Sequence, residues 1–202
     1  MPLINSYKIS PHSFFGIWKI EESTQEMRKI NKSEKINFNE TKNDKKFKES
    51  VACRIIIKHL CPLLNLKYYG INKKNSGKPF LLKNNAFISF SHSYPYAVAL
   101  INKKESCGID IEKIREKILK LNHKFLNKYE TIKVGNSLKE NTIYWSCKEA
   151  LFKADRRQKI SFINDILIDK IEEKDKMRGK LKNKNFILSI KKIEDYIIVY
   201  TN

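Results

Sequence analysis

Cysteine is scarce in this sequence, which has four among 202 residues. Cys53, Cys61, Cys107 and Cys147 lie far apart and form neither a CxxC pair nor a Cys/His spacing that would bind a metal. We therefore expect scattered, buried and reduced thiols, the usual state in a cytoplasmic protein.

Long hydrophobic runs are also missing. No apolar stretch approaches the roughly 18–20 residues that a membrane span needs. Residues 1–5 do not begin a signal peptide, because no charged region precedes an apolar one. These absences predict a cytoplasmic protein with no membrane partner. With 41% hydrophobic and 11% aromatic residues, the chain can form one sizeable domain or two small ones.

Acidic residues are outnumbered, since 22 Asp and Glu stand against 41 Lys and Arg, giving a formal net charge of +19. Part of this excess is expected from nucleotide bias, because Ile and Asn are abundant too and 35 of the 41 basic residues are Lys. The remainder permits an acidic protein, a phosphorylated small molecule or a nucleic acid as partner. Charge alone does not choose among these.

Hydrophobic periodicity predicts an α+β protein. Residues 21–44 match no pattern, 72–79 are expected to form a turn, and the charged stretch 172–184 is expected to be a mobile hairpin tip. The predicted helices are 44–60, 116–130 and 141–157. The predicted strands are 13–20, 67–72, 86–91, 96–102, 108–112, 164–168, 185–190 and 196–201.

The order of these elements repeats along the chain. The helix at 44–60 leads to a strand, a polar loop and two paired strands, and the helix at 141–157 has the same sequel. This repeat predicts a pseudo-twofold pair of similar α+β subdomains, 1–104 and 105–202, with a ligand site in the cleft between them. We expect one compact, two-lobed monomer.

Two carboxylates alternate with two isoleucines in the segment GIDIE (108–112). At the period of a strand, Asp110 and Glu112 point to one side, and Ile109 and Ile111 point to the other. Paired hard oxygen ligands on a rigid strand suit Mg²⁺ that is shared with a phosphate. The alternative is a half-exposed strand with two solvated acids.

Further polar groups lie elsewhere in the chain. Glu149 and Lys153 are four residues apart on one face of a predicted helix, either as a surface ion pair or as part of a site. Ser91 and His92 end a predicted strand, where a capping role is the alternative to ligand binding. Arg54 lies beside the apolar stripe of its helix and is either a surface arginine or a phosphate ligand.

Taken together, these groups offer three carboxylates for one divalent cation, a lysine beside the third, and a hydroxyl–imidazole cluster. Such parts suit the binding of a pyrophosphate and displacement at phosphorus, where positioning and charge neutralisation supply most of the rate. The combination therefore favours a single site for phosphoryl transfer over the alternative that each group is a separate surface feature.

With these motifs the sequence resembles a known family, the 4′-phosphopantetheinyl transferases of the two-halved, surfactin-synthetase-activating type. The resemblance spans residues 45–170 and rests on motifs in a fixed order. These are GKPF (77–80), FSHS (90–93), GIDIE (108–112), FLNKYE (125–130) and WSCKEALFKA (145–154). The pseudo-twofold fold of that family, in which each half resembles one subunit of the trimeric holo-acyl-carrier-protein synthase, agrees with the predicted repeat.

The resemblance implies a reaction. Coenzyme A donates its phosphopantetheine arm to a serine of an apo acyl or peptidyl carrier protein, and adenosine 3′,5′-bisphosphate leaves. It also implies that Asp110, Glu112 and Glu149 hold Mg²⁺, or Mn²⁺ in its place. The implied coenzyme A ligands are Lys78, Ser91, His92, Arg54 and Lys153.

The attacking serine belongs to the carrier, so a base must take its proton. The resemblance implies a carboxylate, with Glu130 and Glu149 as the candidates, or a metal-bound water for this role, and the sequence does not choose among them. It further implies that Lys153 neutralises the pyrophosphate and assists the departing phosphate.

The basic surplus has a role in this reaction, because carrier proteins are acidic helical bundles that a lysine-rich surface would attract. The attraction would weaken with salt. We expect docking over 113–140, with exposed contacts at Lys117, Lys120 and Lys124. The chain departs from the family pattern at 155–159, where relatives often carry a glycine-rich turn.

The main alternative function is that of a basic nucleic-acid-binding protein. It would need an RNP, zinc or helix-turn-helix signature, and none is present in the sequence. A third interpretation is an inactive relative kept as a binding module. The intact acidic and lysine positions argue against it.

Overall fold

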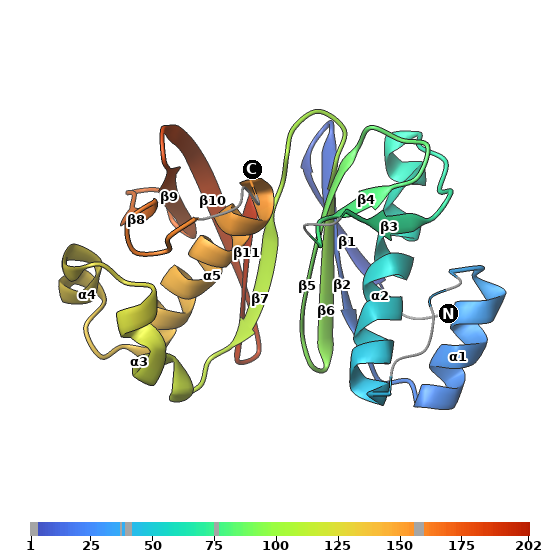
Figure 1. Ribbon diagram of the computed structural model, residues 1–202, viewed down its shortest axis with the longest axis horizontal. Coiled ribbons are helices and arrows are strands. Elements are labelled where there is room, and N and C mark those ends of the chain that lie inside the picture. Colours follow the sequence, from blue (N-terminus) through green and yellow to red (C-terminus); the bar gives the residue numbers. More distant parts are fainter. Residues whose placement is uncertain (1–3, 37, 39–41, 75–76, 156–159) are drawn as a thin grey trace. The chain divides into compact units, whose positions relative to one another are not determined.

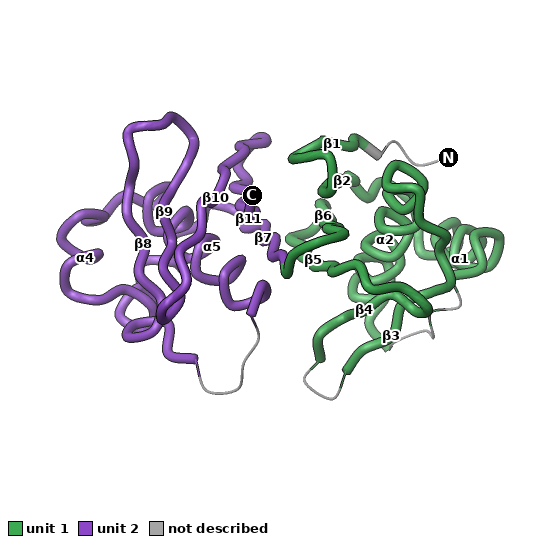
Figure 2. Tube along the Cα trace, turned by 90° about the horizontal axis from the view of Figure 1, so that it is seen from above, with its two compact units in different colours: residues 1–106 green, residues 107–202 purple. Residues whose placement is uncertain are grey.

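Two antiparallel sheets, each packed against one long helix, form the framework of the protein (Figure 1). The computed structural model describes residues 4–36, 38, 42–74, 77–155 and 160–202. Contacts within the chain group it into two units, 1–106 and 107–202, which Figure 2 colours separately. The mixture of helices and sheets confirms the predicted α+β class.

Unit 1 begins with a hairpin and continues through two helices into further strands. Its elements are β1 (Ile4–Ser10), β2 (Ser13–Lys19), α1 (Thr24–Ser33), α2 (Asp44–Leu60), η1 (Pro62–Leu64), β3 (Ile71–Lys73), β4 (Pro79–Leu81), β5 (Phe87–Ser93) and β6 (Tyr96–Asn102). The main sheet has the order β1-β2-β6-β5, and β3 pairs with β4 separately. Helix α2 begins after an N-cap at Asn43 and buries its predicted stripe, including Phe47 and Val51, against β2, β5 and β6.

Unit 2 begins with a strand and reaches its long helix through two short ones. Its elements are β7 (Ile109–Lys113), α3 (Lys117–Leu121), η2 (Asn122–Lys124), α4 (Lys128–Val134), α5 (Leu138–Asp155), β8 (Ile166–Lys170), β9 (Lys176–Leu181), β10 (Lys184–Ile193) and β11 (Tyr196–Thr201). The sheet has the order β7-β11-β10-β9-β8. Helix α5 packs on β7, β8, β9 and β11, and buries Tyr144, Cys147 and Leu151 there.

The two units repeat one strand topology. The path β2-β6-β5 in unit 1 corresponds to β7-β11-β10 in unit 2, and in each the last strand of the unit is central to the three. Equivalent positions carry the same contact, since Lys19 lies over the ring of Tyr96 and Lys113 over the ring of Tyr196, both at 5.7 Å. The repeated order of elements expected from the sequence is therefore a repeat of strand pairing as well.

The structure corrects the prediction for the charged stretch 172–184. A strand, β9, occupies 176–181 and pairs with both β8 and β10, so the stretch is not simply a hairpin tip. Met177, Gly179 and Leu181 alternate inward along it. The lysines and arginine between them hid this period of two in the sequence.

Other element boundaries also differ. Residues 21–44 contain α1, whose capping box of Ser23 and Glu26 is a start signal that the prediction missed. The single helix predicted for 116–130 is interrupted, because Asn127 caps a new helix, α4. Parts of three predictions lie outside the described residues, namely 75–76 in the predicted turn, 156–157 at the end of the predicted helix 141–157, and 156–159 in the stretch that departs from the family pattern.

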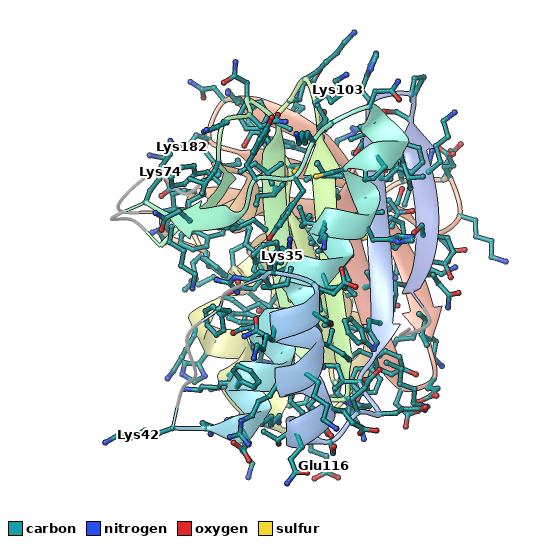
Figure 3. All side chains as sticks on the ribbon, turned by 90° about the vertical axis from the view of Figure 1, so that its right-hand side faces the viewer. Lys35, Lys42, Lys74, Lys103, Glu116 and Lys182 are labelled. Atoms are coloured by element: carbon teal, nitrogen blue, oxygen red, sulfur yellow. The ribbon has the colours of Figure 1, made fainter. Side chains whose placement is uncertain are left out.

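Most charged side chains of the described residues lie on the surface, but Glu49, Arg54, Asp110, Glu130 and Lys148 are buried. All four cysteines are buried, as predicted. The lysines labelled in Figure 3, which include Lys35, Lys42 and Lys74 of unit 1 and Lys182 of unit 2, are exposed. In the part of the chain that the structure describes, no helix is both long and apolar enough to cross a membrane.

Helix α5 lies directly on the backbone of Gly108, just before β7. A Cβ atom at this position would lie 1.8 Å from the carbonyl oxygen of Ala150 and 2.9 Å from the amide nitrogen of Ala154. Those atoms belong to the helix backbone and cannot turn away as a side chain can. Glycine is therefore required at 108 for α5 to lie this close to the start of β7.

We predict that Gly108→Ala lowers the free energy of unfolding by ~3 kcal/mol or more, because the helix backbone would have to move. Gly179→Ala is the matched control, since its Cβ would meet Leu151 Cδ1, the end of a flexible side chain, at 2.6 Å. Denaturant unfolding of both variants measures the difference. Equal losses in the two would contradict the requirement for glycine at 108.

Candidate active site

The two carboxylates of β7 face α5. Lys153 Nζ donates a hydrogen bond to Asp110 Oδ1 at 2.6 Å, and Trp145 Nε1 donates to Glu112 Oε1 at 3.1 Å. Ile109 and Ile111, which alternate with the acids, are buried as well. Asp110 is only 2% exposed, so the alternative of two solvated acids is wrong.

A single face of α5 carries three polar groups. Trp145, Glu149 and Lys153 follow one another at intervals of four residues and so lie along one side of the helix. Trp145 contacts the far end of the acid pair, Glu112, and Lys153 contacts the near end, Asp110. The helix therefore runs antiparallel to β7. Glu149, which is half-buried, lies midway along the helix between these two contacts. We call Asp110, Glu112, Glu149 and Lys153 the acidic site.

Aromatic packing holds Trp145 in place. Its ring centroid lies 5.1 Å from that of Phe125, edge to face, and 5.5 Å from that of Phe162. Phe125 is completely buried. An indole packed in this way has little rotational freedom, so its N–H remains directed at Glu112.

The acidic site brings like charges together away from water. Burial raises the pKa of Glu112, and the neighbouring charge of Asp110 raises it further. The hydrogen bond from Trp145 and the positive charge of Lys153 act in the opposite direction. Together these effects leave the pKa of Glu112 raised, so a positive charge bound beside its carboxylate would stabilise the ionised form.

The residues of the acidic site fit a hard divalent cation. Carboxylate oxygens are the ligands that Mg²⁺ prefers, and Mg²⁺ typically takes one or two of them together with phosphate oxygens. Among the described residues, no three Asp, Glu, His or Cys side chains are already arranged as a metal cluster. The ammonium of Lys153 occupies the place of a cation at Asp110 Oδ1. Ion binding at that oxygen would require Lys153 to turn toward another anion.

Glu130, the other predicted base, lies in a different environment. It is 1% exposed, and its Oε2 lies 2.6 Å from Nζ of the equally buried Lys148. The same oxygen accepts a hydrogen bond from the Asn127 amide and thereby caps α4. Burial lowers the pKa of Lys148, and the bond to Glu130 opposes that change. The partners of Glu130 are thus all groups of the protein interior.

The remaining predicted ligands lie in unit 1. His92 Nδ1 is 3.1 Å from Oε2 of the buried Glu49, and the histidine itself is 46% exposed. Its neighbour Ser91 is buried. Lys78 Nζ donates to Ser106 Oγ at 3.2 Å. These side chains combine one exposed imidazole with an ammonium group on neighbouring segments of one unit.

Arg54 is buried rather than exposed on the surface. It is 7% exposed, its guanidinium carbon lies 4.0 Å from the ring centroid of Phe38, and Nη1 donates to the carbonyl of Ser50 at 2.9 Å. Burial lowers its pKa. The surface-arginine alternative is therefore wrong, and stacking on an aromatic ring is its main contact.

Only one of the two units carries the acid pair. By strand register, Lys19 and Lys113 occupy equivalent positions opposite Tyr96 and Tyr196. Counting back from these lysines, Gly16 and Trp18 of β2 stand where β7 has Asp110 and Glu112. The repeated topology thus holds an acidic site in unit 2 and apolar residues at the same strand positions in unit 1.

A family comparison agrees with this placement of the site. Residues 106–201 match the family model of the 4′-phosphopantetheinyl transferase superfamily. The matched stretch is just under half of the chain and includes the whole acidic site. It supports a transferase that moves phosphopantetheine. No curated protein matches the chain.

Sequence reasoning missed several partners of the predicted residues. Trp145 and Lys148 lie in the motif at 145–154, but the sequence predicted no function for either of them. Glu49 and Phe38 were not predicted to belong to a site. For Lys148 a signal existed, because a lysine next to Cys147 in an apolar helical stripe needs a buried acid as partner. The other partners depend on tertiary contacts between segments far apart in the chain.

The pKa of Glu112 leads to a prediction about stability. Because folding raises this pKa, the folded chain binds the proton more tightly than the unfolded chain, and stability falls as pH rises from the ordinary value of 4.5 through the raised value. Glu112→Gln should therefore raise the melting temperature at pH 7–8 in chelator by about 2–4 °C, the change that ~1 kcal/mol gives in a chain of this size.

The matched control is Glu116→Gln, an exposed residue labelled in Figure 3, which should leave the melting temperature unchanged. Magnesium should raise the melting temperature of the wild type more than that of Glu112→Gln, because ligand binding stabilises the folded state. A lower melting temperature for Glu112→Gln in chelator would show that its charge is already fully compensated.

Proposed function

We propose that the protein transfers the 4′-phosphopantetheine group of coenzyme A to a serine of an apo acyl or peptidyl carrier protein, releasing adenosine 3′,5′-bisphosphate. The observation that carries this proposal is the contact of Lys153 with Asp110 on the face of α5 that also bears Glu149. The strand topology repeated in the two units supports the two-halved, surfactin-synthetase-activating type.

Asp110, Glu112 and Glu149 are the residues that would hold Mg²⁺, with Mn²⁺ as a substitute of similar chemistry. When bound, the ion supplies charge neutralisation for the pyrophosphate oxygens of coenzyme A. The raised pKa of Glu112 supports this assignment, because burial and the neighbouring Asp110 disfavour the ionised carboxylate and a bound cation would favour it.

Lys153 binds the pyrophosphate and stabilises the departing phosphate. Its side chain is 13% exposed, and Nζ also donates to the carbonyl of Ile109 at 3.3 Å. An ammonium group shielded from water in this way interacts strongly with negative charge that develops as the bond to the leaving group breaks. These contacts of Lys153 with Ile109 and Asp110 place its charge at the start of β7, beside Asp110.

Glu149 is the base. The serine oxygen of the carrier forms a bond to the phosphorus that bears the pantetheine arm, while the bond from that phosphorus to adenosine 3′,5′-bisphosphate breaks and its electron pair leaves with the bisphosphate. The serine proton passes to Glu149. We prefer Glu149 to Glu130 because Glu149 is half-buried on the face that bears Lys153, whereas Glu130 is enclosed by protein groups.

Unit 1 binds the nucleotide end of coenzyme A in this proposal. Lys78 and His92 supply positive or hydrogen-bonding groups for the 3′-phosphate. Ser91, the preceding residue of β5, supplies a hydroxyl, although successive side chains of a strand point to opposite faces. Glu49 orients the imidazole of His92 through its carboxylate. Arg54 is the weakest of these candidates, because Phe38 covers its guanidinium group.

The carrier docks on the helices between β7 and α5. Lys117, Lys120 and Lys124 are exposed there. The neighbouring α4 adds Ile132, which is 84% exposed, and Tyr129, which is 58% exposed. Apolar side chains close to several lysines suit an acidic helical partner, which would be steered by charge and held by apolar contact. We place this activity in the cytoplasm and assign it to a monomer.

Incubation with coenzyme A, Mg²⁺ and an apo carrier protein should add one phosphopantetheine group to the carrier, measured by intact mass spectrometry. Asp110→Ala or a chelator should abolish this gain, because either removes part of the proposed metal site. Asp169→Ala, which changes a partly exposed acid of unit 2, is the control and should retain activity.

Failure to modify several different apo carriers would overturn the proposal. Nucleic-acid binding that survives moderate salt, without coenzyme A binding, would favour the alternative of a nucleic-acid-binding protein.

Lys153→Ala should lower kcat by about 10²–10³-fold while changing coenzyme A binding much less, because its charge acts mainly on the leaving group. Steady-state kinetics and a separate coenzyme A titration measure the two effects. Lys182→Ala removes an exposed lysine of the same unit (Figure 3) and should change neither. Unchanged turnover in Lys153→Ala would remove this lysine from the mechanism.

A further inference from the structure

Glu130 and Lys148 form an ion pair inside unit 2. The side chains are 1% and 0% exposed, and Glu130 Oε2 lies 2.6 Å from Lys148 Nζ. Burial of two opposite charges is costly unless both are fully hydrogen-bonded. A buried pair of this kind therefore constrains the segments that supply its remaining partners.

Lys148 uses all its donors within the protein. Besides Glu130, its ammonium group donates to the carbonyl of Phe162 and to the carbonyl of Ile166, both at 2.8 Å. The last of these carbonyls belongs to the first residue of β8. Lys148 thus joins the middle of α5 to the segment that leads from α5 into the sheet.

Glu130 is satisfied in the same way. One oxygen accepts hydrogen bonds from Lys148 and from the Asn127 amide at 3.0 Å, and the other accepts from the Ile168 amide at 2.9 Å. A base must reach the proton that it takes, directly or through one water. A carboxylate enclosed by two backbone amides and an ammonium group has no such access.

The pair also determines how α5 is rotated about its axis. Successive helix residues are separated by about 100°, so anchoring Lys148 in the interior fixes the direction of the next residue, Glu149. The same rotation carries Lys153 to Asp110 and Trp145 to Glu112. A substitution of Lys148 would therefore shift Glu149 and Lys153 in the acidic site, although Lys148 does not contact that site.

We propose that Glu130 and Lys148 are positioning residues, a buried latch that sets the rotation of α5 and thereby aligns Glu149 and Lys153 for the reaction. This inference rests on the proposed transferase function, and it removes Glu130 from the candidates for the base. Its effect is on the geometry of the site rather than on contact with substrate.

The first test is Lys148→Met, which keeps the length of the side chain and removes its charge and donors. We expect kcat to fall about 10²-fold, as misplacement of a catalytic group by ~1 Å can produce, with the KM for coenzyme A changed less than about 3-fold. Assays are run well below the unfolding transition, so that only folded protein is compared. Unchanged kcat would reduce the pair to a purely structural role and overturn the proposal.

The second test asks whether Lys148 acts through Lys153. In the background of Lys148→Met, the further change Lys153→Ala should lower kcat by less than it does in the wild type, because the lysine is already misplaced. Full additivity of the two losses would contradict the coupling. If Lys148→Met does not fold, Lys148→Arg replaces it with the same expectations, since a planar guanidinium keeps the charge but cannot reproduce the three converging donors.

The third test separates positioning from proton transfer at Glu130. Glu130→Gln should lower the height of the pH profile of kcat/KM and leave its acidic limb in place, because Glu149 remains the group that must be ionised. Loss of the acidic limb would restore Glu130 as the base. Lys176→Met is the control, since Lys176 pairs with the exposed Glu173 at the surface, outside the proposed docking helices, and should change neither profile nor kcat.

The outcomes distinguish this inference from the proposed function. If the wild-type protein transfers no phosphopantetheine, the function fails, and a double-mutant cycle of Glu130→Gln and Lys148→Met on unfolding free energy still tests the latch. Additive losses in that cycle would overturn the latch whatever the activity. If the wild type is active and the variants keep full kcat, the inference alone fails.

Discussion

The rest of unit 2 depends on one close contact, the helix backbone of α5 resting on the backbone of Gly108. With no side chain at 108, the carbonyl of Ala150 lies where a Cβ atom would be. This approach brings the polar face of the helix within hydrogen-bond distance of β7. Lys153 then reaches Asp110 and Trp145 reaches Glu112 without extending into solvent.

Two lysines of α5 show how the same charge can serve different purposes. Lys148 donates to three acceptors in the interior, so its ammonium group is saturated and fixed. Lys153 lies at the edge of the protein interior, where its side chain is 13% exposed, beside acids that repel each other. A saturated buried charge defines geometry, whereas a charge at the margin can exchange one anion for another. A lysine that fixes the geometry and a lysine that can bind an anion are thus separated by little more than one turn of α5.

Much of the fold could be predicted from the sequence, because long helices and apolar strands leave strong periodic signals. The bounds of α2 and β6 were predicted as observed, whereas β9 was missed because lysines masked the inward alternation of Met177 and Leu181. In the candidate site, motifs predicted Asp110 and Glu149. No local pattern could predict that Glu130 faces Lys148, because that pairing depends on how α4 and α5 pack.

The difference between the two strand repeats sets how many acidic sites of this kind one chain contains. Gly16 and Trp18 stand in β2 at the register that Asp110 and Glu112 occupy in β7. A symmetric assembly of identical acidic halves would hold as many sites as halves. In this chain one half has no carboxylates at those positions, so under the proposed function each polypeptide would have one reaction centre, although it has two similar units.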